Sequence, residues 1–384
     1  MSPTPRVLFV GPRPDAPGGI AQFCSNLILS VREEADVDVL AFRRLYPRWT
    51  KPGRLGPDAT AVGGAIPARA VLVPWNPLTW RAGAQDARAF DPDLVVAQWW
   101  HPLLGPCLRS LSKRLRRGGV EVVFVCHNGR PHERFPFTRL LSRRALRTAS
   151  RLFALSGPVA DELRALAPGV PTEVLSHPPN LSGQAPAEGH PRSRWAERIG
   201  PVDGPVVLFF GHVRRYKGLE DLIAAMPIVR EEIPATLVVA GRFFTPLKHV
   251  RALIERCNAS DVVRLHPGYV RADEIGDLFS CADVVALPYR EASQSGIVSQ
   301  AALFERPVVA TNVGGLAEAV GDRGILVPPA RPEELAAGIV RALQDPPPPP
   351  ALPTVGWNDW REAILGATTA HRAALQLAPM IEAW

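Results

Sequence analysis

The chain has 384 residues, a length that suits two domains. Of these residues, 46% are hydrophobic and 21% are charged, a composition that excludes a disordered chain. It lacks the roughly 18 to 20 uninterrupted apolar residues of a membrane span, and its start reads as a strand instead of a signal peptide, so we expect a cytoplasmic protein. The five cysteines are odd in number and include no CxxC pair. We therefore expect buried free thiols, with neither a disulfide framework nor a structural zinc site.

The first half alternates strand and helix patterns. Residues 6–11 form an apolar run that ends in glycine, a Pro/Gly-rich loop follows, and residues 20–34 have a helical pattern. Further strand patterns lie at 37–42, 68–74, 93–98, 121–127 and 151–156. This alternation is typical of a parallel sheet with helices on both faces, and it predicts a Rossmann-like domain over 1–180.

The second half repeats the alternation after an interruption. Between about Val174 and Arg194, Pro, Gly, Ser and His replace any periodicity, so we expect the interdomain linker there. Strand and helix patterns then resume and predict a second doubly wound domain over 195–345. A run of prolines over 346–350 predicts a stiff spacer, and the closing segment, 356–384, has a helical pattern.

The net charge of +7 is unevenly distributed. Residues 101–155 hold twelve Arg or Lys against Glu121 and Glu133, and within 109–151 the arginines alternate with Leu and Ala at helical spacing. Such a segment favours anionic partners, and it either docks on an anionic membrane surface or is a solvated helix face, two interpretations of equal weight. Nucleic acid is disfavoured because no recognition motif accompanies the charge.

The segment GHVRRYKGLEDLIAAMP, which follows an apolar run at 205–210, is a candidate phosphate site. Lys217 with Arg214 or Arg215 would stabilise the charge of a departing diphosphate through charge-assisted hydrogen bonds. The segment resembles the strand-to-helix turn of the family-4 retaining glycosyltransferases, in which a Gly-Arg pair precedes Lys-Gly. His212 stands where that family usually has its arginine.

The resemblance extends over residues 265–329, which are similar to the donor-binding region of that family. It aligns Gln300 with a glutamate that holds ribose hydroxyls, and it places Glu291 one residue from the first glutamate of the family's pair. An uncharged Gln300 still offers hydrogen bonds to a ribose diol. A small-residue loop at a helix start, whose backbone N–H groups favour phosphate, is formed by Ser293, Gln294, Ser295 and Gly296.

In the first half, the resemblance points to three further residues. Gly18 and Gly19 precede the first helix where family-4 enzymes have a Gly-Gly pair near the donor phosphate or the acceptor, although such a pair is also an ordinary tight turn. His127 directly follows a strand and matches a histidine that contacts the transferred sugar. His101 also follows a strand, with acceptor and structural roles equally open, and Cys126 is not expected to act as a nucleophile with His127.

The resemblance implies a GT-B fold, an α/β architecture of two Rossmann-like doubly wound domains facing a cleft, with a C-terminal helix that returns to the N-terminal domain. The implied activity is metal-independent sugar transfer, with retention, from a nucleoside-diphosphate-sugar co-substrate to a glycan or lipid-linked acceptor in cell-surface polysaccharide or glycoconjugate biosynthesis. No cofactor and no metal site are expected. The alternatives are a non-catalytic partner protein of the same fold, suggested by Gln300 and His212, and a nucleotide-sugar epimerase or NAD-dependent dehydrogenase, against which the absence of GxGxxG counts.

Overall fold

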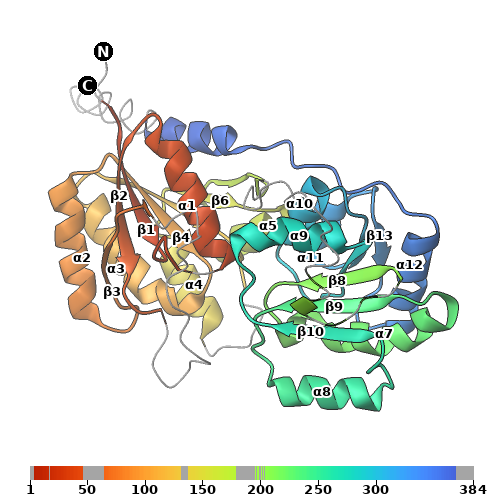
Figure 1. Cartoon of the computed structure of the whole chain (residues 1–384). Helices are drawn as coiled ribbons and strands as arrows, with labels where there is room; N and C mark the ends of the chain where they lie inside the picture. Colours follow the sequence, from red (N-terminus) through yellow and green to blue (C-terminus); the bar gives the residue numbers. More distant parts are fainter. Residues whose placement is uncertain are drawn as a thin grey trace. The chain divides into compact units, whose positions relative to one another are not determined.

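A computed structural model divides the chain into two compact units (Figure 1). Unit 1 comprises Met1–Pro178 with Val355–Trp384, and unit 2 comprises Pro179–Thr354. The structure describes residues 4–16, 18–45, 65–130, 137–178, 195, 197–198, 200, 202 and 204–368. Each unit has its own sheet and its own core clusters.

Unit 1 contains a seven-stranded parallel sheet with the strand order β3-β2-β1-β4-β5-β6-β7. Its central strands are almost entirely apolar because both faces of the sheet are covered. The elements are β1 (Arg6–Gly11), α1 (Gly19–Arg32), β2 (Asp36–Phe42), β3 (Arg69–Leu72), α2 (Pro77–Phe90), β4 (Leu94–Trp99), the 3-10 helix η3 (Pro102–Leu104), α3 (Gly105–Arg116), β5 (Glu121–Cys126), α4 (Thr138–Leu146), β6 (Arg151–Ala154), α5 (Gly157–Leu166) and β7 (Thr172–Val174).

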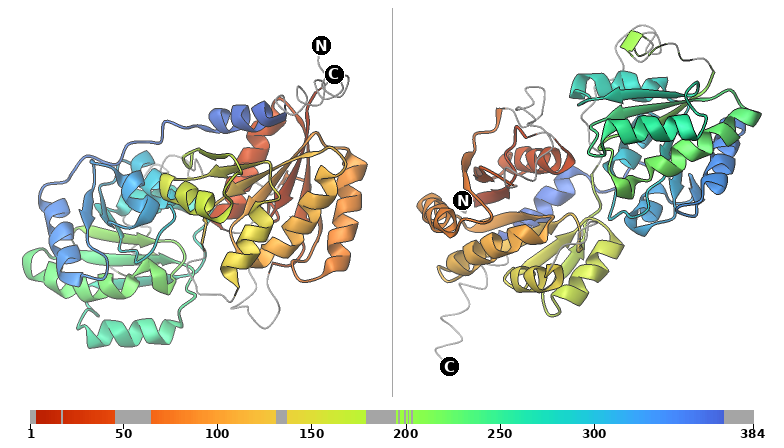
Figure 2. Two further views of the ribbon diagram at one scale, coloured as in Figure 1. Left: turned by 180° about the vertical axis from the view of Figure 1, so that it is seen from behind. Right: turned by 90° about the horizontal axis from the view of Figure 1, so that it is seen from below.

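Alternate residues of the central strands in unit 1 belong to different cores. Leu8 and Val10 of β1 pack in the cluster that α2 to α5 cover, whereas Val7 and Phe9 pack in the cluster that α1 covers. The second cluster also includes Trp360 and Ile364, from a helical segment at 357–368. Figure 2 shows this segment, drawn in blue, beside α1, drawn in red.

The helical residues 357–368 are fixed to the rest of unit 1 by both packing and hydrogen bonds. Trp360 is fully buried, its ring centroid lies 5.2 Å from that of Phe23, and its indole N–H donates to the carbonyl oxygen of Ser176 at 3.1 Å. Ser30 of α1 donates to the carbonyl oxygen of Trp357 at 2.9 Å. The segment that completes the core of unit 1 therefore follows all of unit 2 in the sequence.

Unit 2 contains a six-stranded parallel sheet with the strand order β10-β9-β8-β11-β12-β13. Helices again cover both faces: α7, α8 and α12 pack on one, and α9, α10 and α11 on the other. The elements are β8 (Val206–Phe210), the 3-10 helix η4 (Arg215–Lys217), α7 (Leu219–Glu232), β9 (Thr236–Gly241), α8 (Leu247–Arg256), β10 (Val263–Pro267), α9 (Ala272–Cys281), β11 (Val284–Leu287), α10 (Gly296–Leu303), β12 (Val308–Thr311), α11 (Gly314–Val320), β13 (Ile325–Val327) and α12 (Pro332–Gln344).

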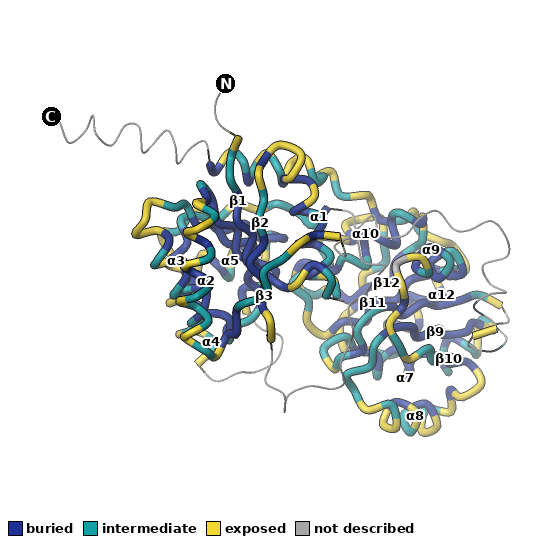
Figure 3. The backbone as a smooth tube through the Cα atoms, turned by 60° about the vertical axis from the view of Figure 1, so that its left-hand side comes forward, coloured by how far each residue is buried: buried dark blue, intermediate teal, exposed yellow. Residues whose placement is uncertain are grey.

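The structure confirms the predicted α/β class, with a doubly wound parallel sheet in each unit. The strands are mostly buried along their length (Figure 3). One strand, β7, was not predicted, because its three residues, Thr-Glu-Val, are exposed or half-buried and form no apolar run. The predicted linker over 174–194 begins at the end of β7, and residues 179–194 lie outside the described residues. The thiols are buried as expected except that of Cys257, which is partly exposed.

Candidate functional site

In unit 2 the strand order reverses between β8 and β11. The sheet continues from β8 to β9 on one side and from β11 to β12 on the other, so the loops after β8 and β11 diverge. In open parallel sheets, ligands bind outside the carboxyl ends of the strands at such a switch point. Lys217 lies in the loop after β8 and Tyr289 in the loop after β11. The predicted lysine therefore lies where the topology places a ligand.

Lys217 is held by a series of polar contacts that ends at a helix start. Its ammonium donates to the hydroxyl of Tyr289 at 2.7 Å and lies 4.3 Å from the centre of the ring. The Tyr289 hydroxyl is 3.4 Å from the hydroxyl of Ser295. Ser295 is the N-cap of α10 and accepts from the backbone N–H of Ile297. A cation and the positive end of a helix dipole thus meet within one series, an arrangement that favours a phosphate.

Two glycines allow the surrounding loops to approach closely. Gly218 has φ +65°, and a Cβ there would lie 1.9 Å from the carbonyl oxygen of Pro288. Gly314 has φ +45°, and a Cβ there would lie 1.9 Å from the carbonyl oxygen of Ala292. The loop after β11 is therefore packed against backbone on both sides. No other residue fits either position without moving that loop.

An ion pair joins the same loop to the start of α7. Arg290 donates to both carboxylate oxygens of Asp221, at 2.7 and 2.8 Å. Its backbone N–H also donates to the carbonyl oxygen of Tyr216 at 2.7 Å. These contacts fix the loop that carries Tyr289 relative to η4, which carries Lys217.

A second group of cations surrounds the ring of Phe244. The guanidinium of Arg214 lies 4.0 Å from the ring centre and that of Arg242 lies 4.9 Å from it, distances typical of cation–π contacts. The imidazole of His212 lies 5.2 Å from the same ring. Burial lowers the pKa of His212 to about 4, and the charges of Lys217, Arg214 and Arg242 lower it further. His212 is therefore neutral at pH 7, beside three cations that a polyanion would stabilise.

The other predicted donor residues differ in their placement. Gln300 is 4% exposed, and among the described residues nothing donates a hydrogen bond to its side-chain oxygen. Gly296 is the first residue of α10, and Ser293 and Gln294 are half-buried in the loop before it. Arg215 and Glu291 are exposed. The structure thus brings together Lys217, Arg214 and Ser295.

In unit 1 the strand order reverses between β1 and β4, and His127 lies near this second switch point. Its backbone N–H donates to the carbonyl oxygen of Trp99 at 2.9 Å, and its Nε2 lies 2.8 Å from Oε1 of Gln98. Burial lowers the pKa of His127 to about 3, with a further contribution from His177. In this orientation of the Gln98 amide, Nε2 of His127 donates to Oε1 of Gln98, and Nδ1 is the acceptor of the ring.

Phe23 and Gln98 complete the surroundings of His127. The centroid of the Phe23 ring lies 5.1 Å from that of His127 and 5.0 Å from that of His177. The side-chain nitrogen of Gln98 is buried and has no hydrogen-bond acceptor among the described residues.

The predicted glycine pair lies at the start of α1. Gly18 has φ +123° and is the N-cap of a helix without a side-chain cap. A Cβ on Gly19 would meet no heavy atom within 4 Å. The space beside Gly19 is therefore open.

The structure also places His101 and Cys126. His101 is the N-cap of η3, and its Nδ1 accepts from the backbone N–H of Leu103 at 3.2 Å, so the structure gives this histidine a structural role. Cys126 is buried in the core, where burial raises the pKa of its thiol well above the ordinary value. Such a thiol is not a nucleophile. The described part of the chain contains no cluster of three or more His, Cys, Asp or Glu side chains that could hold a metal ion.

Sequence reasoning missed several residues that complete these sites. Tyr289 and Gln98 had a detectable signal, since each is a polar residue within or directly after an apolar strand pattern. Arg242 and Phe244 had none, because their relation to Arg214 depends on the pairing of β8 with β9.

Comparisons with known proteins give matches over both units. The profile described as "Glycosyl transferases group 1" matches residues 204–345, and that described as "Glycosyl transferase 4-like domain" matches residues 18–180. A crystal structure of HepE from Anabaena, in complex with UDP and glucose, has a TM-score of 0.70 at 18% identity and covers 99% of this chain and 100% of that chain. Sucrose-phosphate synthase from Thermosynechococcus elongatus has a TM-score of 0.68 at 19% identity, with 98% of each chain covered. At these identities the likeness establishes the fold.

Curated relatives match over part of their length. D-inositol 3-phosphate glycosyltransferase of Xylanimonas cellulosilytica is 34% identical over 185 residues, which are 47% of this chain and 42% of the relative. Alpha-D-kanosaminyltransferase of Streptomyces kanamyceticus is 29% identical over 245 residues, which are 59% of this chain and 62% of the relative. The chain spans about half the length of the curated relatives that it matches.

Proposed function

Since the chain belongs to the group 1 glycosyltransferases of the GT-B fold, we propose that it transfers a sugar from a nucleoside-diphosphate-sugar to a glycan or lipid-linked acceptor with retention of configuration. The observation that carries this proposal is the series from Lys217 through Tyr289 to Ser295 at the start of α10. It combines a fixed ammonium with the positive end of a helix dipole, two features that favour the binding of a diphosphate.

The donor's diphosphate is assigned to unit 2. Lys217 and Arg214 bind its oxygens, and the loop of Ser293, Gln294, Ser295 and Gly296 holds it through hydroxyl and backbone N–H groups. Arg242, which lies beside Arg214 on Phe244, adds a third positive charge. Gln300 accepts a hydrogen bond from the ribose, which would satisfy its buried oxygen. Support for UDP in particular comes from the similar structures of HepE from Anabaena, which are complexes with UDP.

The transfer needs no group beyond these side chains and the two substrates. The bond between the anomeric carbon and the phosphate oxygen breaks, and a bond from that carbon to the acceptor oxygen forms on the same face of the sugar. The acceptor's proton passes to the leaving phosphate. Cations that bind the phosphate more tightly as its charge develops lower the barrier, because they act in the transition state more than in the ground state.

We assign to His127 the role of orienting the transferred sugar or the acceptor. With Nε2 directed to Gln98, its Nδ1 is left as an acceptor for a hydroxyl. Gly18 and Gly19 allow the start of α1 to approach a phosphate or a hydroxyl, because the first turn has no side-chain cap. The proposal places the protein in the cytoplasm, in the synthesis of cell-surface polysaccharide or glycoconjugates.

Release of nucleoside diphosphate from UDP-, GDP- and ADP-sugars tests the proposal, with and without glycan acceptors. We expect one donor to be hydrolysed slowly and transferred faster when an acceptor is present. Lys217→Ala should lower the rate by about a hundredfold to a thousandfold, whereas Lys248→Ala, which removes an exposed lysine of α8, should leave it unchanged. Interconversion of sugars without transfer would indicate an epimerase, and a protein that binds a donor but never turns it over would be a non-catalytic member of the family.

A further inference from the structure

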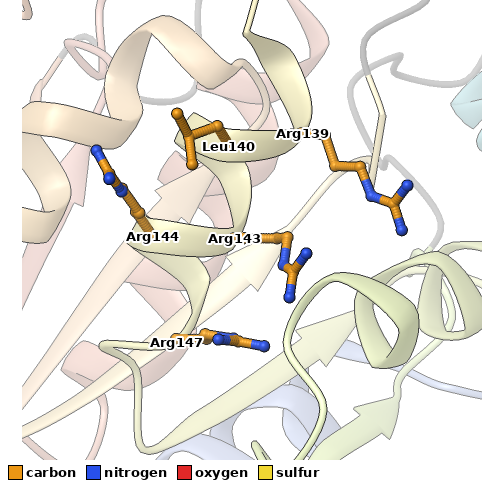
Figure 4. A pocket seen from close by; sticks show the side chains of 5 residues that line it. All are labelled: Arg139, Leu140, Arg143, Arg144 and Arg147. Carbon is orange, nitrogen blue, oxygen red and sulfur yellow. The ribbon is translucent and has the colours of Figure 1, made fainter.

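One helix of unit 1 presents an unusual concentration of positive charge. Arg139, Arg143, Arg144 and Arg147, together with Leu140, line a hollow of about 440 Å³ on α4 and its C-cap. We call this surface the α4 arginine face. Figure 4 shows the side chains of Arg139, Arg143 and Arg147 on one side of the helix, and those of Arg144 and Leu140 on the other. The helical period explains both rows, because each contains residues four positions apart.

This arrangement is unfavourable for the isolated protein. Like charges four residues apart on a helix destabilise it, and the row from Arg139 through Arg143 to Arg147 contains two such pairs. In the described ranges of the chain, no carboxylate forms an ion pair with any of the four arginines. An external anion would remove this repulsion.

Exposed apolar side chains accompany the charge. The side chain of Phe137, at the N-cap of α4, is 76% exposed, and that of Leu140 is 45% exposed. A surface that combines guanidinium groups with exposed apolar side chains suits the boundary between the headgroups and acyl chains of a bilayer. A soluble anion would account for the arginines but not for Phe137 and Leu140.

The neighbouring helix extends the basic surface. α3 packs against α4, and its last turn and C-cap contribute the exposed side chains of Lys113, Arg116 and Arg117. The guanidinium of Arg116 also donates to the carbonyl oxygen of Thr148, just after α4, at 3.1 Å. Both helices therefore carry positive charge at their adjoining C-terminal ends.

We propose that the α4 arginine face docks on a bilayer of anionic phospholipid, with Phe137 and Leu140 entering the interface. The inference goes beyond the transfer reaction, since it rests on the charge and exposure of one helix and not on the donor site. Docking of this kind would bring the protein to the surface where a lipid-linked acceptor resides. In the described part of the chain no helix is long and apolar enough to cross a bilayer.

Co-sedimentation with vesicles tests the docking. The full-length protein should bind vesicles of phosphatidylcholine mixed with phosphatidylglycerol, should not bind phosphatidylcholine alone, and should lose binding at high salt. A variant that replaces all four arginines with Gln should bind the anionic vesicles at least about a hundredfold more weakly, because four basic residues that each contribute about fivefold together contribute about six-hundredfold. Gln keeps the helix propensity of the segment close to that of Arg.

A matched control removes the same number of charges from unit 2. Its four substitutions are at exposed positions: Lys248→Gln, Arg251→Gln, Arg256→Gln and Arg341→Gln. This variant should retain most of the vesicle binding. If both variants lose vesicle binding equally, net charge alone explains the binding and the proposal is wrong. Tighter binding to single-stranded RNA than to vesicles at the same salt would also overturn it. Donor hydrolysis in solution should be unchanged in the α4 variant, so failure of docking is distinguishable from failure of the proposed function.

Discussion

Lys217 is positioned by its neighbours instead of extending freely into solvent. The hydroxyl of Tyr289 accepts from its ammonium, and Tyr289 is itself buried beside the cap of α10. A lysine held in this way loses less conformational entropy when it binds a phosphate. This contact makes Lys217 a better candidate for phosphate binding than a lysine that extends freely.

Gln300 provides a test in which stability and binding should change in opposite directions. Its buried side-chain oxygen lacks a donor among the described residues, and an unsatisfied buried acceptor costs about 1 to 3 kcal/mol. Gln300→Leu should therefore leave the free protein as stable or more stable, while it weakens nucleoside diphosphate binding about tenfold. Urea unfolding and calorimetric titration measure the two effects. A loss of stability with unchanged affinity would assign Gln300 a structural role instead.

Arg242 tests whether the cation group around Phe244 acts as one anion site. Arg242→Gln should weaken nucleoside diphosphate binding by about tenfold, since a hydrogen bond to a charged group contributes about 1.5 to 3 kcal/mol. Arg251→Gln, at an exposed position of α8, is the control. If both variants bind as the original protein does, Arg242 lies outside the donor site.

Some residues of the candidate site could be predicted from the sequence, and others could not. Lys217, Ser295 and Gln300 lie in continuous segments that resemble one family, so the sequence was enough to single them out. Arg242 was missed because it approaches Arg214 only after two strands pair. Arg214 and Arg215 were interchangeable in the sequence, whereas the structure places Arg214 against Phe244 and leaves Arg215 exposed.

Among the elements, the turn between η4 and α7 depends on a single glycine. Gly218→Ala would add a Cβ at φ +65° and 1.9 Å from the carbonyl oxygen of Pro288. Gly169 is the matched control, because it has φ +88° but a Cβ there would meet no atom within 4 Å. We expect Gly169→Ala to cost about 1 kcal/mol and Gly218→Ala about 3 kcal/mol or more, with weaker nucleoside diphosphate binding. If urea unfolding shows that both substitutions lower the free energy of unfolding equally, the loop after β11 moves aside at little energetic cost.

The order of elements followed from the sequence because buried parallel strands form continuous apolar runs. β8 and β11 are of this kind and were predicted within a residue or two. β7 could not be found, since three half-buried or exposed residues at a sheet edge carry no such run. The strand order that creates the two switch points depends on pairing across long stretches of chain, which no local pattern determines.

For the whole molecule, the buried histidines predict how stability depends on pH. The pKa of His127 is lowered to about 3 and that of His212 to about 4, whereas an unfolded histidine titrates near 6.5. Below pH 6.5 the unfolded chain therefore binds protons that the folded protein does not. The free energy of unfolding should fall as the pH is lowered, by about 1.4 kcal/mol per pH unit for each histidine.

Urea unfolding between pH 7 and about pH 5 measures this slope, above the range in which most carboxylates titrate. His127→Gln should reduce the slope, because it removes one group that is neutral when folded and charged when unfolded. An unchanged slope in that variant would mean that His127 is accessible to protons in the folded protein.

The central claim is that unit 2 binds a nucleoside diphosphate through Lys217. The most direct test is the melting temperature of the protein with UDP, GDP or ADP, compared with that of Lys217→Ala under the same conditions. Binding to the folded state alone raises stability, by about 2.7 kcal/mol at a hundredfold excess over the Kd. We expect stabilisation by one nucleoside diphosphate, and we expect Lys217→Ala to lose it. No stabilisation by any of the three at millimolar concentration, or equal stabilisation of the variant, would contradict it.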